Sequence, residues 1–455
     1  MRPALLALLL LAGQQSSPRP NPFQGGVPTG TATSDPIVLS IGDAVNRALE
    51  HNLGVLISDQ ASEQARGARW VALSQLLPNI SGRLSESREK INLAVFGFPL
   101  PPGVPAVVGP FNVFDARVSV TQSVFDLSAI NDARAAAHDA AAARHSYQSA
   151  RDLVVLVAAN VYLQAIAASA RADSARAQVE TAQALYTQAV DLKQNGLIAG
   201  IDLLRAQVQL NTEQQRATAT RNDFEKAKLQ LARVAGLPIG QTFTLSDQIP
   251  YAPVPEMTLE QALDRAYKGR PDYQAALERV QSAEASRAAA AAGALPSVRV
   301  TADFSGIGLT PGDARATFNV TGALNVPIFE GGRTRGRLLE ADAEFRRRRA
   351  EADDLKGAIY YDIRTAFLDL RATGEQLDVA ARTRDLAAAQ LAQARDRFAA
   401  GIASNIEVVQ AQEAVTLASE QYIAGLYSYN VSKTALARGL GSAEEAVRRF
   451  LGGSR

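Results

Sequence analysis

A 16-residue stretch of the sequence recurs 205 residues later, and this duplication constrains the fold more than any other feature. The two copies are LKQNGLIAGIDLLRAQ at 192–207 and RFAAGIASNIEVVQAQ at 397–412. Each copy interrupts an alanine-rich helical pattern at a glycine, Gly196 or Gly401, and resumes it beside an acidic residue, Asp202 or Glu407. Glycine readily adopts the left-handed conformation that ends a helix, and a carboxylate favours the first turn of the next one. Each copy therefore predicts the tip of a helical hairpin.

Apolar residues flank both tips at alternating three- and four-residue steps, which is the spacing of a coiled-coil seam. The seam before the first tip covers 158–189 and consists mostly of small residues. In the second copy, over 363–394, only Thr373 and Arg384 interrupt it. The chain is thus predicted to be a duplicated coiled-coil hairpin. A helix over 126–193 would extend ~100 Å at ~1.5 Å per residue, which is typical of a tunnel or a rod.

The sequence period changes from helical to two after each of two Leu-Pro pairs, at 77–78 and 295–296. Four segments alternate apolar and polar residues, namely 79–88 (weakly), 116–124, 298–306 and 315–326. They predict two β-hairpins of roughly ten-residue strands with one apolar and one polar face. This length suits a tilted strand that crosses a bilayer. A soluble sheet that covers a core is the alternative.

Aromatic residues gather near the long loop predicted at 91–113, as in the interfacial girdle of a membrane barrel. They are Phe96, Phe98, Phe111 and Phe114. Four strands cannot close a barrel, and open strand edges are not tolerated in lipid. A membrane barrel would therefore be shared between subunits, with eight strands from two chains or twelve from three.

The N-terminus has the layout of a secretory signal peptide, because Arg2 precedes an apolar run that is too short to span a membrane. No other uninterrupted apolar stretch of ~18 residues is evident, so no transmembrane helix is expected. Similar helix starts, with Ser40 and Thr258 as N-caps, mark the two halves. The predicted organisation is a signal peptide (1–13), a flexible segment (14–37), a first repeat (38–242), a linker (243–256), a second repeat (257–441) and a tail (442–455).

Composition argues against several classes of function. The net charge of +1 implies no general attraction to nucleic acid. Cysteine is absent, which rules out disulfides, thiolate metal ligands and a cysteine nucleophile. The three histidines have no ligand spacing, and the sequence has no serine elbow and no phosphate loop. We therefore expect no catalytic, cofactor-binding or metal-binding residues, and no enzyme.

The duplication, the strand-to-helix junctions QSVFD and VPIFEGG, and the two tip sequences together resemble the TolC-like outer-membrane efflux proteins over about 37–441. The resemblance implies a mostly α-helical fold in which duplicated coiled-coil hairpins form a long periplasmic tunnel. It also implies a homotrimer in which each chain gives four strands to a shared twelve-stranded barrel in outer-membrane lipid. Such proteins are exit ducts that dock on a periplasmic adaptor protein, which links them to an inner-membrane transporter.

The resemblance further implies roles for residues at the tips. Glu407 stands where the family often places an acidic residue of the closed aperture, and a three-fold ring of carboxylates would favour cations. Gln410 and Phe398 occupy other aperture positions, and Asp202 and Arg205 are the corresponding groups of the first tip. The positions that match the adaptor-facing turns are Gly196, Leu197, Gly401, Ile402 and Ser404. Residues 404–407 also fit a capping box, S-x-x-E, so Glu407 either lines the aperture or only caps a helix.

An exported coiled-coil structural or adhesion protein without a channel is the alternative class of function. Clean alternation in three strands and near-equal helix lengths in both halves favour the channel, because a rod requires neither. The sequence leaves the cargo open among drugs, metals and secreted proteins, since the pump selects it.

Overall fold

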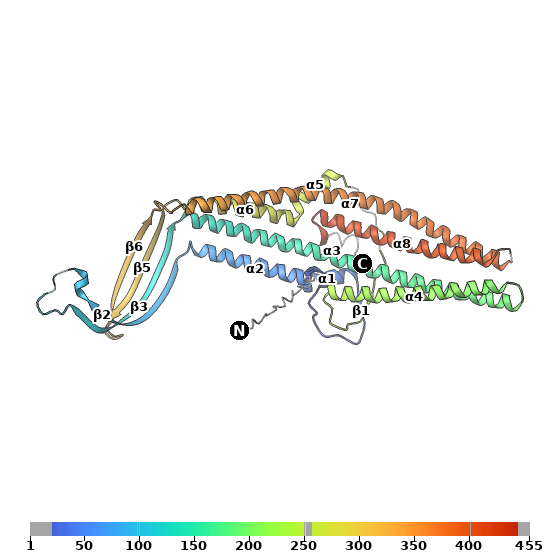
Figure 1. Ribbon diagram of the computed structural model, residues 1–455, viewed down its shortest axis with the longest axis horizontal. Coiled ribbons are helices and arrows are strands. Elements are labelled where there is room, and N and C mark those ends of the chain that lie inside the picture. Colours follow the sequence, from blue (N-terminus) through green and yellow to red (C-terminus); the bar gives the residue numbers. More distant parts are fainter. Residues whose placement is uncertain are drawn as a thin grey trace, which may run out of the picture. The chain divides into compact units, whose positions relative to one another are not determined.

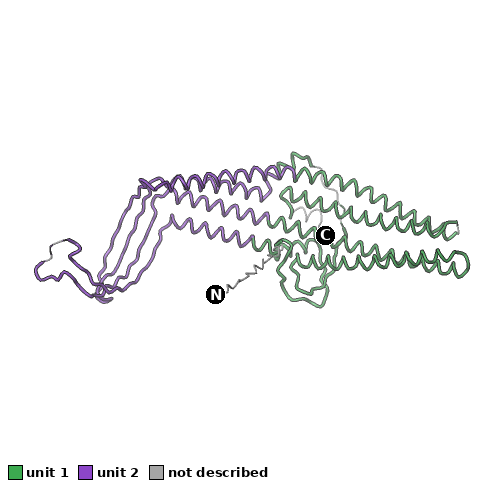
Figure 2. The backbone as a smooth tube through the Cα atoms, viewed as in Figure 1, with its two compact units in different colours: residues 1–57, 150–265, 362–455 green, residues 58–149, 266–361 purple. Residues whose placement is uncertain are grey.

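The computed structural model describes residues 21–97, 99, 101–249, 251, 257–400 and 402–444. The predicted signal peptide, Phe98, Gly401 and the end of the tail lie outside these residues. The chain forms two compact units (Figure 2). Unit 1 takes in the described residues of Met1–Ile57, Ala150–Arg265 and Asp362–Arg455, and unit 2 those of Ser58–Ser149 and Ala266–Tyr361.

Both units draw on both halves of the duplicated sequence, and most of the elements are labelled in Figure 1. In chain order they are η1 (Pro22–Gln24), β1 (Ile37–Leu39), α1 (Ile41–His51), α2 (Leu53–Ser74), β2 (Asn79–Asn92), η2 (Leu93–Phe96), β3 (Val107–Phe125), α3 (Leu127–Gln194), α4 (Gly200–Val234), β4 (Phe243–Leu245), α5 (Leu259–Gly269), α6 (Pro271–Ala292), β5 (Ser297–Gly308), β6 (Arg315–Asn325), α7 (Arg333–Ala399) and α8 (Asn405–Gly439).

The helix predicted over 126–193 and the four predicted strands are all present, but the first two strands are longer than expected. β2 reaches Asn92 and β3 starts at Val107, so the predicted loop over 91–113 is shorter. In the added part, Glu89 and Asn92 of β2 pair with Phe111 and Val107 of β3. Because the residues of β2 in this part are mostly polar, they do not alternate with apolar residues, and the pattern did not predict a strand there.

Both predicted N-caps are confirmed. The Ser40 hydroxyl accepts a hydrogen bond from the Asp43 amide at 3.1 Å, and the Asp43 side chain accepts one from the Ser40 amide. Thr258 and Gln261 exchange the same two bonds, at 3.3 and 3.1 Å. These reciprocal bonds satisfy amide groups that the first helical turn leaves free.

In unit 1, α8 packs along α3 and is joined to it by polar contacts. Gln412 donates a hydrogen bond to the Gln178 carbonyl at 3.3 Å. Arg171 and Glu420 form an ion pair at 3.2 Å. The α3 side of this core is rich in alanine, which lets helices approach closely. Its fully buried residues include Val154, Val155, Ala158, Ala159, Tyr162, Leu163 and Ala165.

Among the described residues, only α3 is long and apolar enough to cross a membrane by length and composition. Asn160 and Gln164 interrupt the apolar part of α3, so it is not an uninterrupted apolar stretch of the kind that the sequence analysis considered. Of this stretch, 61% is buried by the rest of the chain. Burial against other helices identifies it as part of the protein core, because a lipid-facing helix would leave its apolar surface uncovered.

Residues 21–39, most of which were expected to be flexible, make specific contacts in unit 1. The Val27 amide donates to the His51 carbonyl at 2.8 Å. The Phe23 ring covers Gly54 so closely that a Cβ there would lie 2.3 Å from it. Further along, β1 pairs in parallel with β4, which follows α4 in sequence.

Hydrogen bonds from the Tyr162 hydroxyl connect this two-stranded sheet to α3. It lies 2.8 Å from the Leu39 carbonyl and 2.8 Å from Asp247 Oδ2. The same Asp247 oxygen accepts a hydrogen bond from the Ile41 amide at 2.8 Å. Burial and the adjacent Asp247 carboxylate raise the pKa of the Tyr162 hydroxyl, so it stays protonated and remains a donor.

Unit 2 contains an antiparallel sheet with the strand order β2-β3-β5-β6. Its helices are joined by polar contacts between side chains. His138 of α3 lies 2.8 Å from Glu278 of α6, and Arg287 of α6 lies 3.0 Å from Asp342 of α7. These pairs connect α6 with one helix from each half of the sequence.

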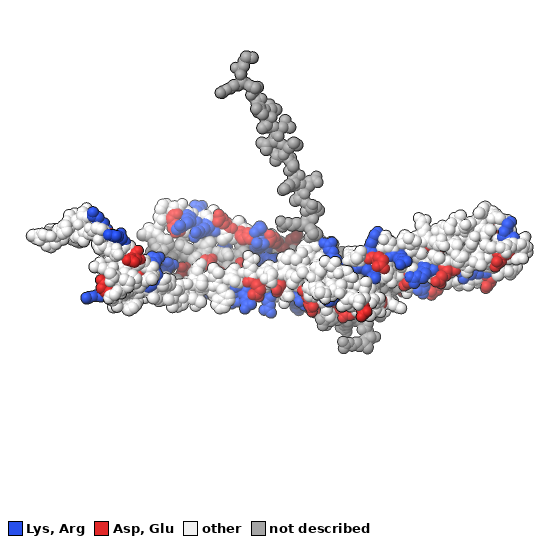
Figure 3. Space-filling model, turned by 90° about the horizontal axis from the view of Figure 1, so that it is seen from below, with Lys and Arg blue, Asp and Glu red and all other residues white. Residues whose placement is uncertain are grey.

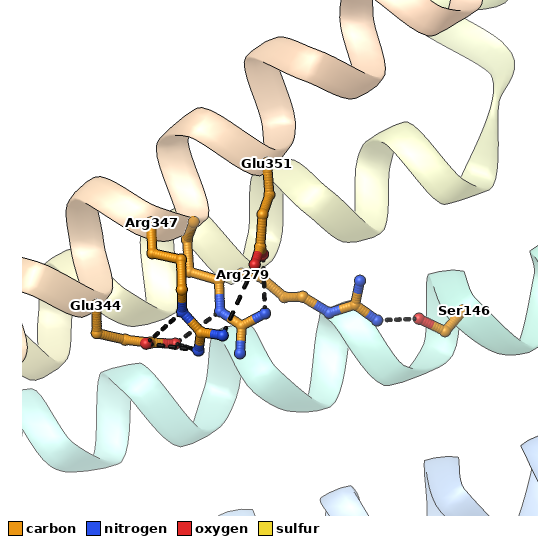
Figure 4. A network of polar contacts seen from close by, with 6 residues as sticks. Ser146, Arg279, Glu344, Arg347 and Glu351 are labelled. Carbon is orange, nitrogen blue, oxygen red and sulfur yellow. Dashed lines mark hydrogen bonds and ion pairs between the residues drawn. The ribbon is translucent and has the colours of Figure 1, made fainter.

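Figure 4 shows a further polar network in this unit. Arg279 of α6 donates a hydrogen bond to the Ser146 hydroxyl of α3 at 2.8 Å. On α7, Arg347 lies 2.6 Å from Glu344 and 3.8 Å from Glu351. Exposed pairs of this kind each contribute only about 0–1 kcal/mol, so they favour solubility and helix register more than stability.

We expect Tyr162→Phe to loosen the contact between β1 and α3, because it removes the donor that faces the Asp247 carboxylate. A lost buried hydrogen bond costs about 1–3 kcal/mol. Amides of β1 and β4 should then exchange with deuterium roughly 5–100-fold faster. Tyr186→Phe on the same helix is the control, since the Tyr186 hydroxyl has no hydrogen bond to the described part of the chain. Equal exchange in the two variants would contradict this role.

Candidate functional site

The register of the four-stranded sheet places polar and apolar residues on opposite faces. Residues in directly opposed positions share a face, and successive residues alternate between faces. Three polar rows across the sheet are Asn79, Thr121, Thr301 and Thr321; Ser81, Ser119, Asp303 and Asn319; and Arg83, Arg117, Ser305 and Thr317. The rows between them are Ile80, Val120, Ala302 and Val320; and Gly82, Val118, Phe304 and Phe318. In these rows β2, whose alternation is weak in the sequence, therefore also has one polar and one apolar face.

The apolar face of the sheet is exposed in the single chain. Phe318 is 81% exposed, Leu84 73% and Ile80 71%. A sheet that covered a soluble core would bury these side chains. A contiguous exposed apolar surface of this kind marks a contact with lipid or with another protein.

Two edges of the sheet are open. β2 and β6 are the outer strands, so each leaves one row of backbone donors and acceptors without a strand partner among the described residues. Lipid offers no hydrogen bonds to such groups. An apolar sheet face with open edges is stable in a membrane only after further strands close the edges.

The tip of the first helical hairpin is a Schellman turn. Gly196 has a φ of +75°. Its amide donates to the Lys193 carbonyl at 3.0 Å, and the Leu197 amide donates to the Leu192 carbonyl at 2.8 Å. These bonds satisfy carbonyl groups at the end of α3. The prediction that Gly196 leaves the helix in the left-handed conformation is confirmed, and Leu197 is left 70% exposed.

The second tip repeats one of these bonds, because the Ile402 amide donates to the Arg397 carbonyl at 2.9 Å. Gly401 lies outside the described residues. The capping box predicted here does not form. Ser404 is the N-cap residue of α8, but its side chain makes no capping hydrogen bond. Glu407 instead faces Arg397, at 3.6 Å.

Asn405 connects the two tips and was missed by the sequence analysis. Its side-chain amide donates a hydrogen bond to the Asp202 carbonyl at 2.9 Å, and the residue is 3% exposed. The only signal in the sequence was a polar residue beside the predicted cap. Such residues are common in turns, so the pattern gave no reason to expect a bond to a distant segment.

Phe398 was expected at the aperture, but the structure places it in the core of unit 1. It is 6% exposed and belongs to a cluster with Leu185, Leu391, Ala394, Val408 and Ala411. The reason is its position in the seam that joins the hairpins, where a large apolar side chain fills the space that small residues leave. In the single chain its side chain therefore packs within the core.

The remaining residues that were predicted for the aperture lie at the tips and are at least partly exposed. Asp202 and Arg205 form an ion pair at 3.2 Å on the first turns of α4. Gln410 is exposed, and the Glu407 side chain is 44% exposed. Both carboxylates therefore have an arginine of the same chain beside them.

An apolar groove of about 310 Å³ lies between α4 and α8 next to the tips. Its lining is Ile201, Leu204, Arg205, Val208, Gln209, Ile406, Val409 and Glu413. Ile402, at the neighbouring turn, is 72% exposed. Apolar grooves with a few polar groups at the rim are suited to the apolar face of a helix.

Glu213 is a buried carboxyl group behind this groove. It is 1% exposed, accepts a hydrogen bond from Gln209 at 3.0 Å and lies 3.4 Å from Arg216. Burial raises the pKa of the Glu213 carboxyl, and Glu413 on α8 raises it further, whereas Arg216 lowers it. The signal that could have identified it is its seam position, three residues after the apolar Leu210.

The family model described as outer membrane efflux protein matches residues 44–237 and 262–442. The chain belongs to the outer membrane efflux protein family. It is therefore an outer-membrane channel with a periplasmic helical extension, and it serves as an exit duct for efflux. Members of the family are channel proteins and not enzymes. The alternative of a coiled-coil protein without a channel is set aside.

The chain is also similar to individual outer-membrane proteins. It is 22% identical over 419 residues to the pyoverdine export outer membrane protein OpmQ of Pseudomonas putida, covering 88% of this chain and 85% of that one. The Campylobacter jejuni CmeC outer membrane channel has a TM-score of 0.75 at 18% identity, with 89% and 86% coverage. The open state of the Neisseria gonorrhoeae MtrE outer membrane channel has a TM-score of 0.75 at 16% identity, with 89% coverage of each chain. These structures share the fold of this efflux protein.

Substitutions at neighbouring positions of β6 should have different effects, because the two side chains lie on opposite faces of the sheet. We expect Val320→Arg, on the apolar face, to cost about 2–4 kcal/mol near the bilayer midplane. Asn319→Arg, on the polar face, should cost much less because its side chain stays in water. The measurement is the yield of heat-modifiable, membrane-inserted oligomer. Equal yields would show that the apolar face does not meet lipid.

The packing of α4 against α8 should strengthen as the pH falls toward the ordinary glutamate pKa of 4.5. A carboxyl group whose pKa is raised on folding stabilises the fold below its ordinary pKa and loses this contribution as the pH rises through the raised value. Hydrogen exchange of α4 and α8, corrected for the intrinsic rate, should slow about tenfold per unit of pKa shift. Glu213→Gln should abolish this dependence, and Glu225→Gln, an exposed change on the same helix, should retain it. A pH dependence that survives Glu213→Gln would exclude Glu213 as its source.

Proposed function

We propose that this outer-membrane efflux protein works as a homotrimer whose three sheets close one twelve-stranded barrel. The open edges of β2 and β6 support this arrangement, because the edge of one chain can pair with the opposite edge of the next. The apolar face then meets outer-membrane lipid, and the polar face lines the water-filled lumen. The single observation that carries the proposal is the register, which separates a polar from an apolar face over the region where all four strands pair, from Asn79 to Leu84 on β2.

In the proposed trimer the hairpin tips form the periplasmic aperture. Glu407 and Asp202 supply carboxylates, Arg205 moderates their charge, and Gln410 adds a polar group. The 3.6 Å approach of Arg397 to Glu407 supports a role in the aperture over a role in capping, because the capping bonds are missing.

We further propose that a periplasmic adaptor protein docks on the tips. Exposed Leu197 and Ile402, together with the apolar groove between α4 and α8, support this role. Gly196 and Ser404 shape the turns that present these side chains, and Gly401 is assigned to the docking surface from its place in the sequence. The adaptor connects the duct to an inner-membrane transporter, which supplies the energy, so the duct itself conducts passively.

Opening of the proposed aperture requires the two hairpins of one chain to move apart near the tips. The polar contacts to be broken include the hydrogen bond from Asn405 to Asp202 and that from Gln412 to Gln178. Bonds of this kind contribute about 0.5–1.5 kcal/mol each, so breaking both requires only a small share of the free energy that a docked adaptor could supply.

Ion selectivity tests the role of Glu407. In planar bilayers we expect a small, cation-preferring conductance, and Glu407→Ala should lower the ratio of potassium to chloride permeability at least twofold. Arg397→Ala should raise the ratio, since it removes the cation beside Glu407. Unchanged ratios in both variants would exclude Glu407 from the aperture. Absence of any conductance from a folded trimer would refute the channel itself.

A further inference from the structure

In the part of the sheet where all four strands pair, the polar face carries more positive than negative charge. This region holds four arginines against two aspartates, which gives it a net charge of +2, although the whole chain carries only +1. Its charged residues are Arg83, Arg117, Arg299, Arg315, Asp115 and Asp303.

Each of the two aspartates has a side-chain partner on the sheet. Asp115 forms an ion pair with Arg117 at 2.9 Å, and Asp303 accepts a hydrogen bond from the Ser119 hydroxyl at 2.5 Å. By contrast, Arg83, Arg299 and Arg315 form no ion pair with the described part of the chain. Asp303, whose bond is to a neutral hydroxyl, keeps its charge, so half of the positive charge on this face is uncompensated.

Arg83 and Arg117 lie directly opposite each other on β2 and β3. Like charges in directly opposed positions destabilise a sheet, because their Cβ atoms are only about 4.5–5.5 Å apart. The pair is tolerable where water and anions reach both guanidinium groups. A water-filled lumen provides such an environment, and lipid does not.

Acidic residues elsewhere on the hairpin do not cancel this charge. Glu89 shares the face of Arg83, but it pairs with Phe111, beyond the position where β5 ends opposite Phe114. It also accepts a hydrogen bond from Ser87 at 2.8 Å. Over the helices, by comparison, Figure 3 shows basic and acidic residues interspersed.

We propose that the barrel lumen attracts anions, with Arg83 as the main determining residue and Arg117, which is paired with Asp115, beside it, and that anionic solutes are the cargo class that passes this part of the duct most readily. The inference rests on the proposed trimeric barrel, in which this row supplies a ring of guanidinium groups. Rings of arginine and lysine are typical of anion-selective pores. Neighbouring polar rows are about 7 Å apart, within the screening length of about 8 Å at physiological salt, so their charges act together.

The test is the ratio of chloride to potassium permeability, taken from reversal potentials in a potassium chloride gradient. It is measured in the Glu407→Ala background, so that the Glu407 carboxylates at the tips do not mask the barrel. We expect Arg83→Gln to lower the ratio at least twofold and Arg83→Lys to preserve it. Adding Arg117→Gln to Arg83→Gln should lower it further.

Arg88→Gln is the matched control, because Arg88 lies on the same strand but on the opposite face. It should leave the ratio unchanged. Equal ratios in the Arg83→Gln channel and its parent, with conductance retained, would overturn the proposed anion preference while leaving the channel intact. Loss of conductance in the parent protein itself would instead refute the proposed trimeric barrel.

Discussion

Hydrogen bonding at the edges of the four-stranded sheet is the constraint on which the rest of this efflux protein depends. One chain leaves the outer sides of β2 and β6 without strand partners among the described residues, and lipid cannot satisfy their backbone groups. A barrel completed by other copies removes both edges. Because side chains alternate between faces, closing the barrel also separates a lipid-facing surface from a polar lumen.

The two helical hairpins are held together by close apolar packing and by a few polar bonds. Small residues of α3 allow close approach, and Phe398 fills the remaining space near the tips. Polar bonds from Asn405 and Gln412 set the register between hairpins. Such bonds are specific but individually weak, which suits the proposed opening at the tips.

Charge is distributed unevenly in a chain whose net charge is close to zero. Carboxylates at the tips, Asp202 and Glu407, each have an arginine nearby. On the polar face of the sheet, arginines such as Arg83 outnumber their partners. The net charge of the whole sequence is the sum over both regions, so it shows neither the carboxylates at the tips nor the excess of arginine on the sheet.

The sequence by itself determined the duplicated hairpins, the four strands and the family, because helical and two-residue periodicities are local and recur in both halves. It located the left-handed Gly196 for the same reason. Only the tertiary structure decided that Phe398 is buried, that Ser404 makes no side-chain cap, that Asn405 joins the tips and that Arg83 faces Arg117. Each of these depends on which distant segment lies opposite a residue. A local pattern fixes the face on which a side chain lies, but the partner across that face is set by packing and strand register.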